Sequence, residues 1–144
     1  LKERVIGIQD KHMEALHKAE DILITSHYYV NKMITSGVSE EKIKLAQEHI
    51  RKGQWFWDIV AAESSAGFHN PQGAMDSLMV SIEESNEAIN LAIEELTKKG
   101  VNLEEVKTEI EKVKKAVYDE KDNFKKKEKA VNSYFPAQQP APKK

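Results

Sequence analysis

The sequence contains no cysteine, and this absence excludes several kinds of site within the chain. There can be no disulfide, no thiolate metal ligand, no cysteine nucleophile and no thioether attachment of a prosthetic group. Glycine and proline are also scarce, with six and four residues among 144. Because these two residues are the strongest breakers of regular structure, their scarcity favours long helices with few interruptions.

Neither sign of charge is in large excess, because 22 basic side chains are interleaved with 24 acidic ones and the formal net charge is −2. No basic face is left to neutralise phosphates, so nucleic acid is not an expected partner. No apolar run approaches the roughly 18 residues that a transmembrane helix needs. The chain begins at Leu1 and has no signal-peptide pattern, and we therefore expect it to be a piece of a longer polypeptide.

Apolar and small residues recur at alternating spacings of three and four along four segments, and no segment alternates with the period of a strand. The pattern predicts an all-α fold, a bundle of four long antiparallel helices arranged as helical hairpins. Gly37, Gly67 and Gly100 mark the ends of the first three helices. The positions expected to be buried are Leu16, Ala19, Leu23, Ser26, Val30 and Met33; then Ile43, Ala46, Ile50, Gly53, Trp57 and Val60; then Met75, Leu78, Ile82, Ser85, Ile89, Ala92 and Leu96; and finally Leu103, Val106, Ile110, Val113, Val117, Phe124 and Val131.

Three sequence signals predict where the later helices begin. Ser39 is placed to cap the second helix, and Asn70 followed by Pro71 is a specific start signal for the third. Asn102 and Glu105 have the spacing of a capping box for the fourth.

The far end of the fourth helix differs from the rest of the chain. Glu120 and Lys127 interrupt its apolar stripe, which predicts that this end faces solvent or another chain. The sequence PAQQPAPKK that follows is typical of disorder. We therefore divide the chain into a helical domain, residues 1–135, and a disordered tail, residues 136–144.

His69 is the residue best placed to bind a metal. It lies in the sequence GFHNP, at the corner between the second and third helices. Gly67 permits a sharp reversal, and Asn70 with Pro71 directs the next helix, so the imidazole is held between two rigid elements. Histidine is a common metal ligand. The alternative is a capping or surface histidine in a turn.

The other four histidines have more ordinary expectations. His17 and His49 fall among charged residues and are expected at the solvated surface. His27 sits beside Tyr28 and Tyr29 and is expected to pack or hydrogen-bond. His12 continues the stripe one turn before Leu16, which is typical of a satisfied residue at the edge of a core. It could also lie against a cofactor bound at the end of the bundle. The sequence has no phosphate-binding glycine loop, nucleophile elbow or HExxH motif, so no catalytic residue is assigned in this chain.

Aromatic residues cover more than one side of the second helix. Trp57 lies on the buried stripe, but Trp55 lies on another face and needs a second surface: another subunit, another domain or a flat cofactor. Gly53 costs about 1 kcal/mol inside a helix and makes sense where something packs closely against it.

The segment 51–71, RKGQWFWDIVAAESSAGFHNP, resembles the C-terminal region of ammonia-forming cytochrome c nitrite reductase, a pentahaem enzyme. The shared pattern is Gln54-Trp55, Trp57-Asp58 and then GFHNP at the start of the next helix. The resemblance extends over about two thirds of the chain and reaches the last helix only through helical character.

The resemblance implies a C-terminal helical domain of a periplasmic enzyme that reduces nitrite to ammonium with six electrons. It implies that His69 is the distal axial ligand of a bis-histidine electron-transfer haem, a haem c attached upstream and outside this chain. Calcium is expected only in the parent enzyme. The implied partners are a second copy through the long helices, the remainder of the parent polypeptide and a redox donor protein, and the isolated chain is expected to be inactive.

Two other hypotheses follow from the residues alone. The chain could be a structural coiled-coil interaction module without haem, with His69 a simple turn residue. It could also be a four-helix bundle that binds a non-covalent haem through His69 and His12.

Overall fold

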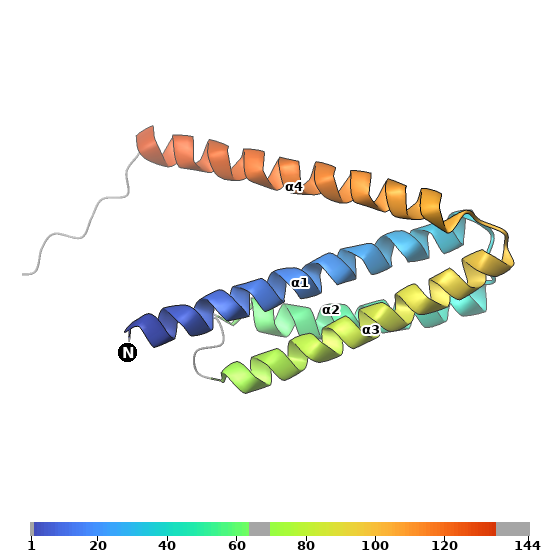
Figure 1. Cartoon of the computed structure of the whole chain (residues 1–144), viewed down its shortest axis with the longest axis horizontal. Helices are drawn as coiled ribbons and strands as arrows, with labels where there is room; N and C mark the ends of the chain where they lie inside the picture. The colour runs from blue at the N-terminus through green and yellow to red at the C-terminus, as the bar shows by residue number, and fades with distance from the viewer. Residues whose placement is uncertain (1, 64–69, 135–144) are drawn as a thin grey trace, which may run out of the picture. The chain divides into compact units, whose positions relative to one another are not determined.

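The structure is a computed structural model that describes residues 2–63 and 70–134. Four helices follow one another in this part of the chain: α1 Lys2–Thr35, α2 Glu40–Ala61, α3 Pro71–Lys98 and α4 Leu103–Tyr134 (Figure 1). The prediction of an all-α fold with four long helices is confirmed. The expected disordered tail, residues 136–144, lies outside the described residues.

The chain divides into two units, Leu1–Lys107 and Thr108–Lys144. In the first unit α1, α2 and α3 pack against one another in all three pairs. Within this unit α2 runs antiparallel to both α1 and α3 (Figure 1). The described part of the second unit continues α4, whose aromatic side chains Tyr118 and Phe124 are exposed.

The helix boundaries follow local sequence signals closely. Gly37 and Gly100 adopt φ values of 75° and 74°, the left-handed conformation that ends α1 and α3. Asn70 caps α3 as expected, because its side-chain oxygen accepts a hydrogen bond from the Gly73 amide at 3.1 Å. Asn102 forms half of the predicted capping box, since its Oδ1 accepts from the amides of Glu104 and Glu105.

Two boundary predictions need correction. Ser39 is the N-cap residue of α2, but its exposed hydroxyl makes no capping hydrogen bond. The second helix ends at Ala61 rather than at Gly67. Val60 is the last buried residue of α2, and Ala61, Ala62 and Glu63 are exposed, so further helix through these positions would cover no apolar surface.

The core of the first unit contains the stripes predicted for the first two helices. All six α1 positions from Leu16 to Met33 are buried or partly buried, and the same holds for α2 from Ile43 to Val60. The α3 stripe is shifted by one residue at alternate positions: Ala74, Ser81 and Ala88 are buried, while Met75 is 38% exposed. The small buried side chains of α3 let its backbone approach the neighbouring helices closely. The larger side chains Ile82 and Ile89 are only partly buried.

None of the helices within residues 2–63 and 70–134 combines the length and the apolar character needed to cross a membrane.

Candidate functional site

His69 lies outside the described residues, so the structure describes only the two ends of the corner that contains it. On one side, α2 ends at Ala61 and the amide of Ala62 donates to the carbonyl of Asp58 at 2.9 Å. On the other side, Asn70 caps α3 and Pro71 is the first helical residue.

Both ends of this corner are held against the N-terminal half of α1. Ala19 of α1 shares a buried apolar cluster with Val60 near the end of α2 and with Ala74 near the start of α3. The indole N–H of Trp57 donates to the carbonyl of Leu16 at 3.0 Å. This bond crosses between two helices and fixes the last turns of α2 on α1. The packing role predicted for Trp57 is thus confirmed.

His12 lies one turn before Leu16 on α1 and is only 4% exposed. Its Nδ1 is enclosed and has no hydrogen-bond partner in the described part of the chain. The three buried serines differ from it, because the hydroxyls of Ser26, Ser81 and Ser85 each donate to a backbone carbonyl. An enclosed polar atom without a partner costs about 1–3 kcal/mol. His12 is therefore buried as predicted, and among the described residues its Nδ1 lacks the partner that the sequence suggested.

Gln54 and Asp58, two members of the motif in segment 51–71, interact directly. The Gln54 amide donates to Asp58 Oδ1 at 2.8 Å across one turn of α2. This bond accounts for their spacing of four residues, because side chains at i and i+4 are neighbours on a helix surface.

Trp55 is 65% exposed, as expected for a residue that needs a second surface. Leu45 and Ile59, also on α2, are 42% and 48% exposed. A groove of about 510 Å³ on this helix is lined by Leu45, Glu48, His49, Arg51, Lys52 and Trp55. The groove combines an aromatic and an aliphatic wall with three nitrogen-bearing side chains, which suits contact with another macromolecule.

Gly53 is buried where α2 crosses α3. The Ser81 hydroxyl donates to the Gly53 carbonyl at 2.7 Å, and a Cβ at position 53 would lie 2.9 Å from Ser85 Oγ and 3.2 Å from the Ser81 carbonyl oxygen. The close packing predicted at Gly53 is confirmed, and the neighbour is α3 of the same chain.

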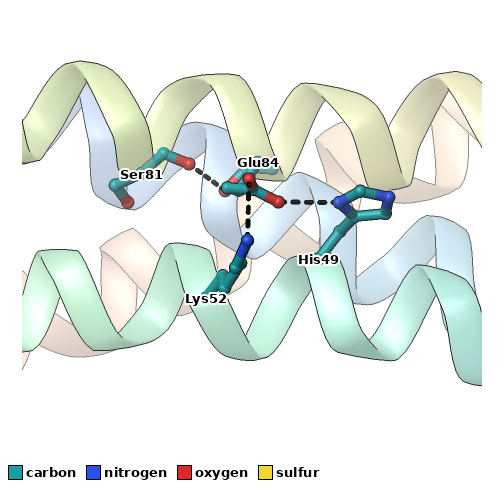
Figure 2. Close-up of polar contacts among 5 residues, drawn as sticks. His49, Lys52, Ser81 and Glu84 are labelled. Atoms are coloured by element: carbon teal, nitrogen blue, oxygen red, sulfur yellow. Dashed lines mark hydrogen bonds and ion pairs between the residues drawn. The ribbon is translucent and has the colours of Figure 1, made fainter.

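A polar cluster beside this crossing was not predicted from the sequence. His49 Nδ1 lies 2.7 Å from Glu84 Oε2, and Lys52 Nζ lies 3.9 Å from Glu84 Oε1 (Figure 2). Both basic side chains project from α2 toward the carboxylate on α3. The side chains of His49 and Glu84 are 29% and 20% exposed, so His49 is not the solvated residue that was expected. In the sequence, the position of His49 next to Ile50, at the edge of the buried stripe, is the feature that could have predicted its partial burial.

His17 and His27 are both at the surface. The side chain of His17 is 65% exposed and lies 3.6 Å from Glu20, in agreement with the prediction. His27 is also exposed, and it lines a second groove with Asn31 and Gln54 between α1 and α2. The packing role expected of His27 is therefore wrong: the stripe passes through Ser26 and Val30, and position 27 points away from it.

The described residues contain no group of three or more His, Asp or Glu side chains able to hold a metal ion. Among the described residues near the corner between α2 and α3, the available chemistry is that of a single imidazole, His12. One imidazole can complete the coordination of an iron already held by other ligands, or it can hydrogen-bond a bound group. It cannot enclose an ion by itself.

Comparison with known proteins supplies the context. The chain is 39% identical over 100 residues to the cytochrome c nitrite reductase subunit NrfA of Nitratidesulfovibrio vulgaris, which covers 65% of this chain and 19% of that protein. It is 32% identical over 103 residues to cytochrome c-552 of Aliarcobacter butzleri, covering 69% of this chain and 21% of that protein.

A solved structure is also similar. The catalytic subunit NrfA of cytochrome c nitrite reductase from Desulfovibrio desulfuricans, described with two calcium sites, matches with a TM-score of 0.58 and 38% identity. The match covers 66% of this chain and 21% of that one. The chain thus spans about a fifth of the length of these relatives.

The sequence profile of the cytochrome c552 family matches residues 1–144, the whole of the chain. The helical organisation, the motif in segment 51–71 and these similarities agree, and the chain belongs to the cytochrome c552 family.

Proposed function

We propose that this chain serves as the C-terminal helical region of a haem-containing nitrite reductase that converts nitrite to ammonium. The observation that carries the proposal is the identity of 38–39% to nitrite reductase subunits over two thirds of the chain. The chain has no cysteine, so any haem c would be attached to another part of the polypeptide. Its contribution would then be ligation and support, and the reduction of nitrite would take place elsewhere in the enzyme.

Within this function His69 is the distal axial ligand of one haem. The corner that carries it joins α2 and α3, and the bond from Trp57 to Leu16 together with the Asn70 cap holds both of these helix ends. The enclosed Nδ1 of His12 on α1 has no hydrogen-bond partner among the described residues, and this supports a bound group at this end of the unit. A haem with two imidazole ligands has no open position, so it transfers electrons and does not bind substrate.

The exposed apolar residues of α2 support a second proposed role, which is association of two copies through the long helices. Trp55, Leu45 and Ile59 together place large apolar side chains on one helix at the surface. Exposed tryptophan is typical of the centre of an interface. We place the complete enzyme in the periplasm with a separate redox donor protein, and its calcium sites in the part of the parent enzyme that precedes this chain.

The ligand assignment is tested in the full-length protein with its haems attached. We expect His69→Ala to convert one low-spin haem to high spin, as counted from the absorption and electron paramagnetic resonance spectra, without loss of haem in the pyridine haemochrome assay. His17→Ala is the matched control, because His17 is an exposed histidine on α1. An unchanged number of low-spin haems in His69→Ala would refute the assignment. A full-length protein without haem would refute the function.

A further inference from the structure

A second stripe of residues runs along α2, on the side of the helix opposite to its buried stripe. Its members follow one another at alternating steps of four and three residues, and the side chain of each is exposed. This outer stripe consists of Glu41, Leu45, Glu48, Lys52, Trp55 and Ile59. The buried stripe contacts α1 and α3, whereas the outer stripe has the heptad spacing of a helix that pairs with a further helix.

The centre of the outer stripe has apolar ends and opposite charges between them. Leu45 and Trp55 are 42% and 65% exposed, and Glu48 and Lys52 lie between them in the sequence. The side chain of Lys52 is 70% exposed, with its Nζ 3.9 Å from Glu84 Oε1. These four central residues line the groove of about 510 Å³ described above. A partner for this surface therefore needs apolar side chains at both ends and both signs of charge in the middle.

A second copy of α2 meets this requirement in one arrangement. If the two helices run antiparallel and are level at residue 50, Leu45 lies opposite Trp55 of the partner subunit. In the same alignment Glu48 lies opposite Lys52 of the partner subunit. Each contact occurs twice, because a two-fold interface is built from the same surface on both copies. Apolar side chains thus meet apolar side chains, and each charge meets its opposite.

Other alignments of the same two stripes lose this match. A parallel pair in register places Glu48 opposite Glu48 of the partner subunit and Lys52 opposite Lys52 of the partner subunit. Like charges placed opposite each other at an interface are unfavourable. A shift of the antiparallel pair by one heptad places Leu45 opposite Glu48 of the partner subunit, or Trp55 opposite Lys52 of the partner subunit. The order of charges along the outer stripe therefore favours one orientation and one register.

We infer that two copies of this chain associate through an antiparallel contact between their α2 helices, centred at residue 50, in which Glu48 and Lys52 select the alignment. The inference rests on the proposed association of two copies, and it adds the direction, the register and the charges that specify this contact. Trp55 and Leu45 supply the apolar surface that becomes buried. The two Glu48–Lys52 pairs act mainly by disfavouring other alignments.

Charge reversal tests the pairing in the full-length protein with its haems attached. Glu48→Lys and Lys52→Glu each place like charges opposite each other twice, so each should raise the dimer dissociation constant at least about tenfold in sedimentation equilibrium. An equimolar mixture of the two variants should regain the wild-type constant, because opposite charges then face each other in both pairs. Glu94→Lys is the matched control, because Glu94 is also an exposed acid with a lysine, Lys98, four residues later.

Disulfide cross-linking tests the orientation independently, because the chain has no cysteine of its own. In the inferred contact Glu41 lies opposite Ile59 of the partner subunit, whereas each residue lies about 27 Å along the helix axis from its own equivalent. A mixture of Glu41→Cys and Ile59→Cys should form a disulfide-linked dimer under mild oxidation, and neither variant should do so alone. Cross-linking of either variant with itself, or none in the mixture, would overturn the inferred register.

The outcomes separate this inference from the proposed function. A dimeric wild type whose dissociation constant does not respond to Glu48→Lys would overturn the inferred alignment and leave the association itself intact. If Lys52→Glu does not fold, because it places a second acid beside Glu84, the Glu48→Lys measurement and the cross-linking decide. A monomeric wild type would remove the proposed association and the inference together. The haem ligand keeps its separate readout, the spin state of His69→Ala.

Discussion

At the residue scale, Gly53 shows how one missing side chain sets the distance between two helices. A methyl group here would lie 3.2 Å from the Ser81 carbonyl oxygen, which belongs to the α3 backbone and cannot rotate away. We expect Gly53→Ala to gain up to about 1 kcal/mol of helix propensity but to lose about 1–3 kcal/mol through overpacking. The net result is a lower free energy of unfolding, measured by chemical denaturation followed by circular dichroism.

Gly7 is the matched control for Gly53. It also lies inside a helix, but a Cβ there would meet no atom within 4 Å. Gly7→Ala should therefore raise the free energy of unfolding by about 0.5–1 kcal/mol. If Gly53→Ala stabilises the chain as much as Gly7→Ala does, the close approach of α3 is not the reason for glycine at position 53.

At the scale of single helices, capping distinguishes the start of α3 from the start of α2. Asn70 accepts a hydrogen bond from the Gly73 amide, whereas the Ser39 side chain makes no such bond. Asn70→Ala should therefore lower the free energy of unfolding by about 1 kcal/mol, and Ser39→Ala should change it by much less. Thermal denaturation of the two variants side by side checks this difference. Equal losses would contradict the capping geometry.

At the scale of the whole molecule, the proposed association between copies assigns the interface to the exposed face of α2. Trp55 is the most exposed of the large apolar residues of α2. Burial of a tryptophan at the centre of an interface is worth about 2 kcal/mol or more. Trp55→Glu should therefore raise the dimer dissociation constant of the full-length protein by at least about tenfold, as measured by sedimentation equilibrium. Met79→Glu, at a 51% exposed position on α3, is the control. A wild-type constant for Trp55→Glu would exclude this face as the interface.

The sequence by itself determined the features whose causes are local. Gly37 and Gly100 end helices because the left-handed conformation is inexpensive only for glycine, and Asn70 with Pro71 begins one because both act within a single turn. The stripes of α1 and α2 follow from periodicity along one helix. The absence of cysteine was likewise sufficient to exclude thioether attachment of a haem within this chain.

Only the tertiary structure decided features that depend on a neighbouring helix. The buried face of α3 passes through Ala74 and Ser81 rather than Met75, because Ser81 meets Gly53 of α2 and Ala74 packs in a cluster with Ala19 of α1 and Val60 of α2. The pairing of His49 with Glu84 joins residues 35 positions apart, and no pattern along either helix specifies such a contact. The surroundings of the His12 Nδ1 also depend on tertiary structure. Periodicity predicts that the side chain is buried, whereas its hydrogen-bond partners depend on what the folded chain places around it.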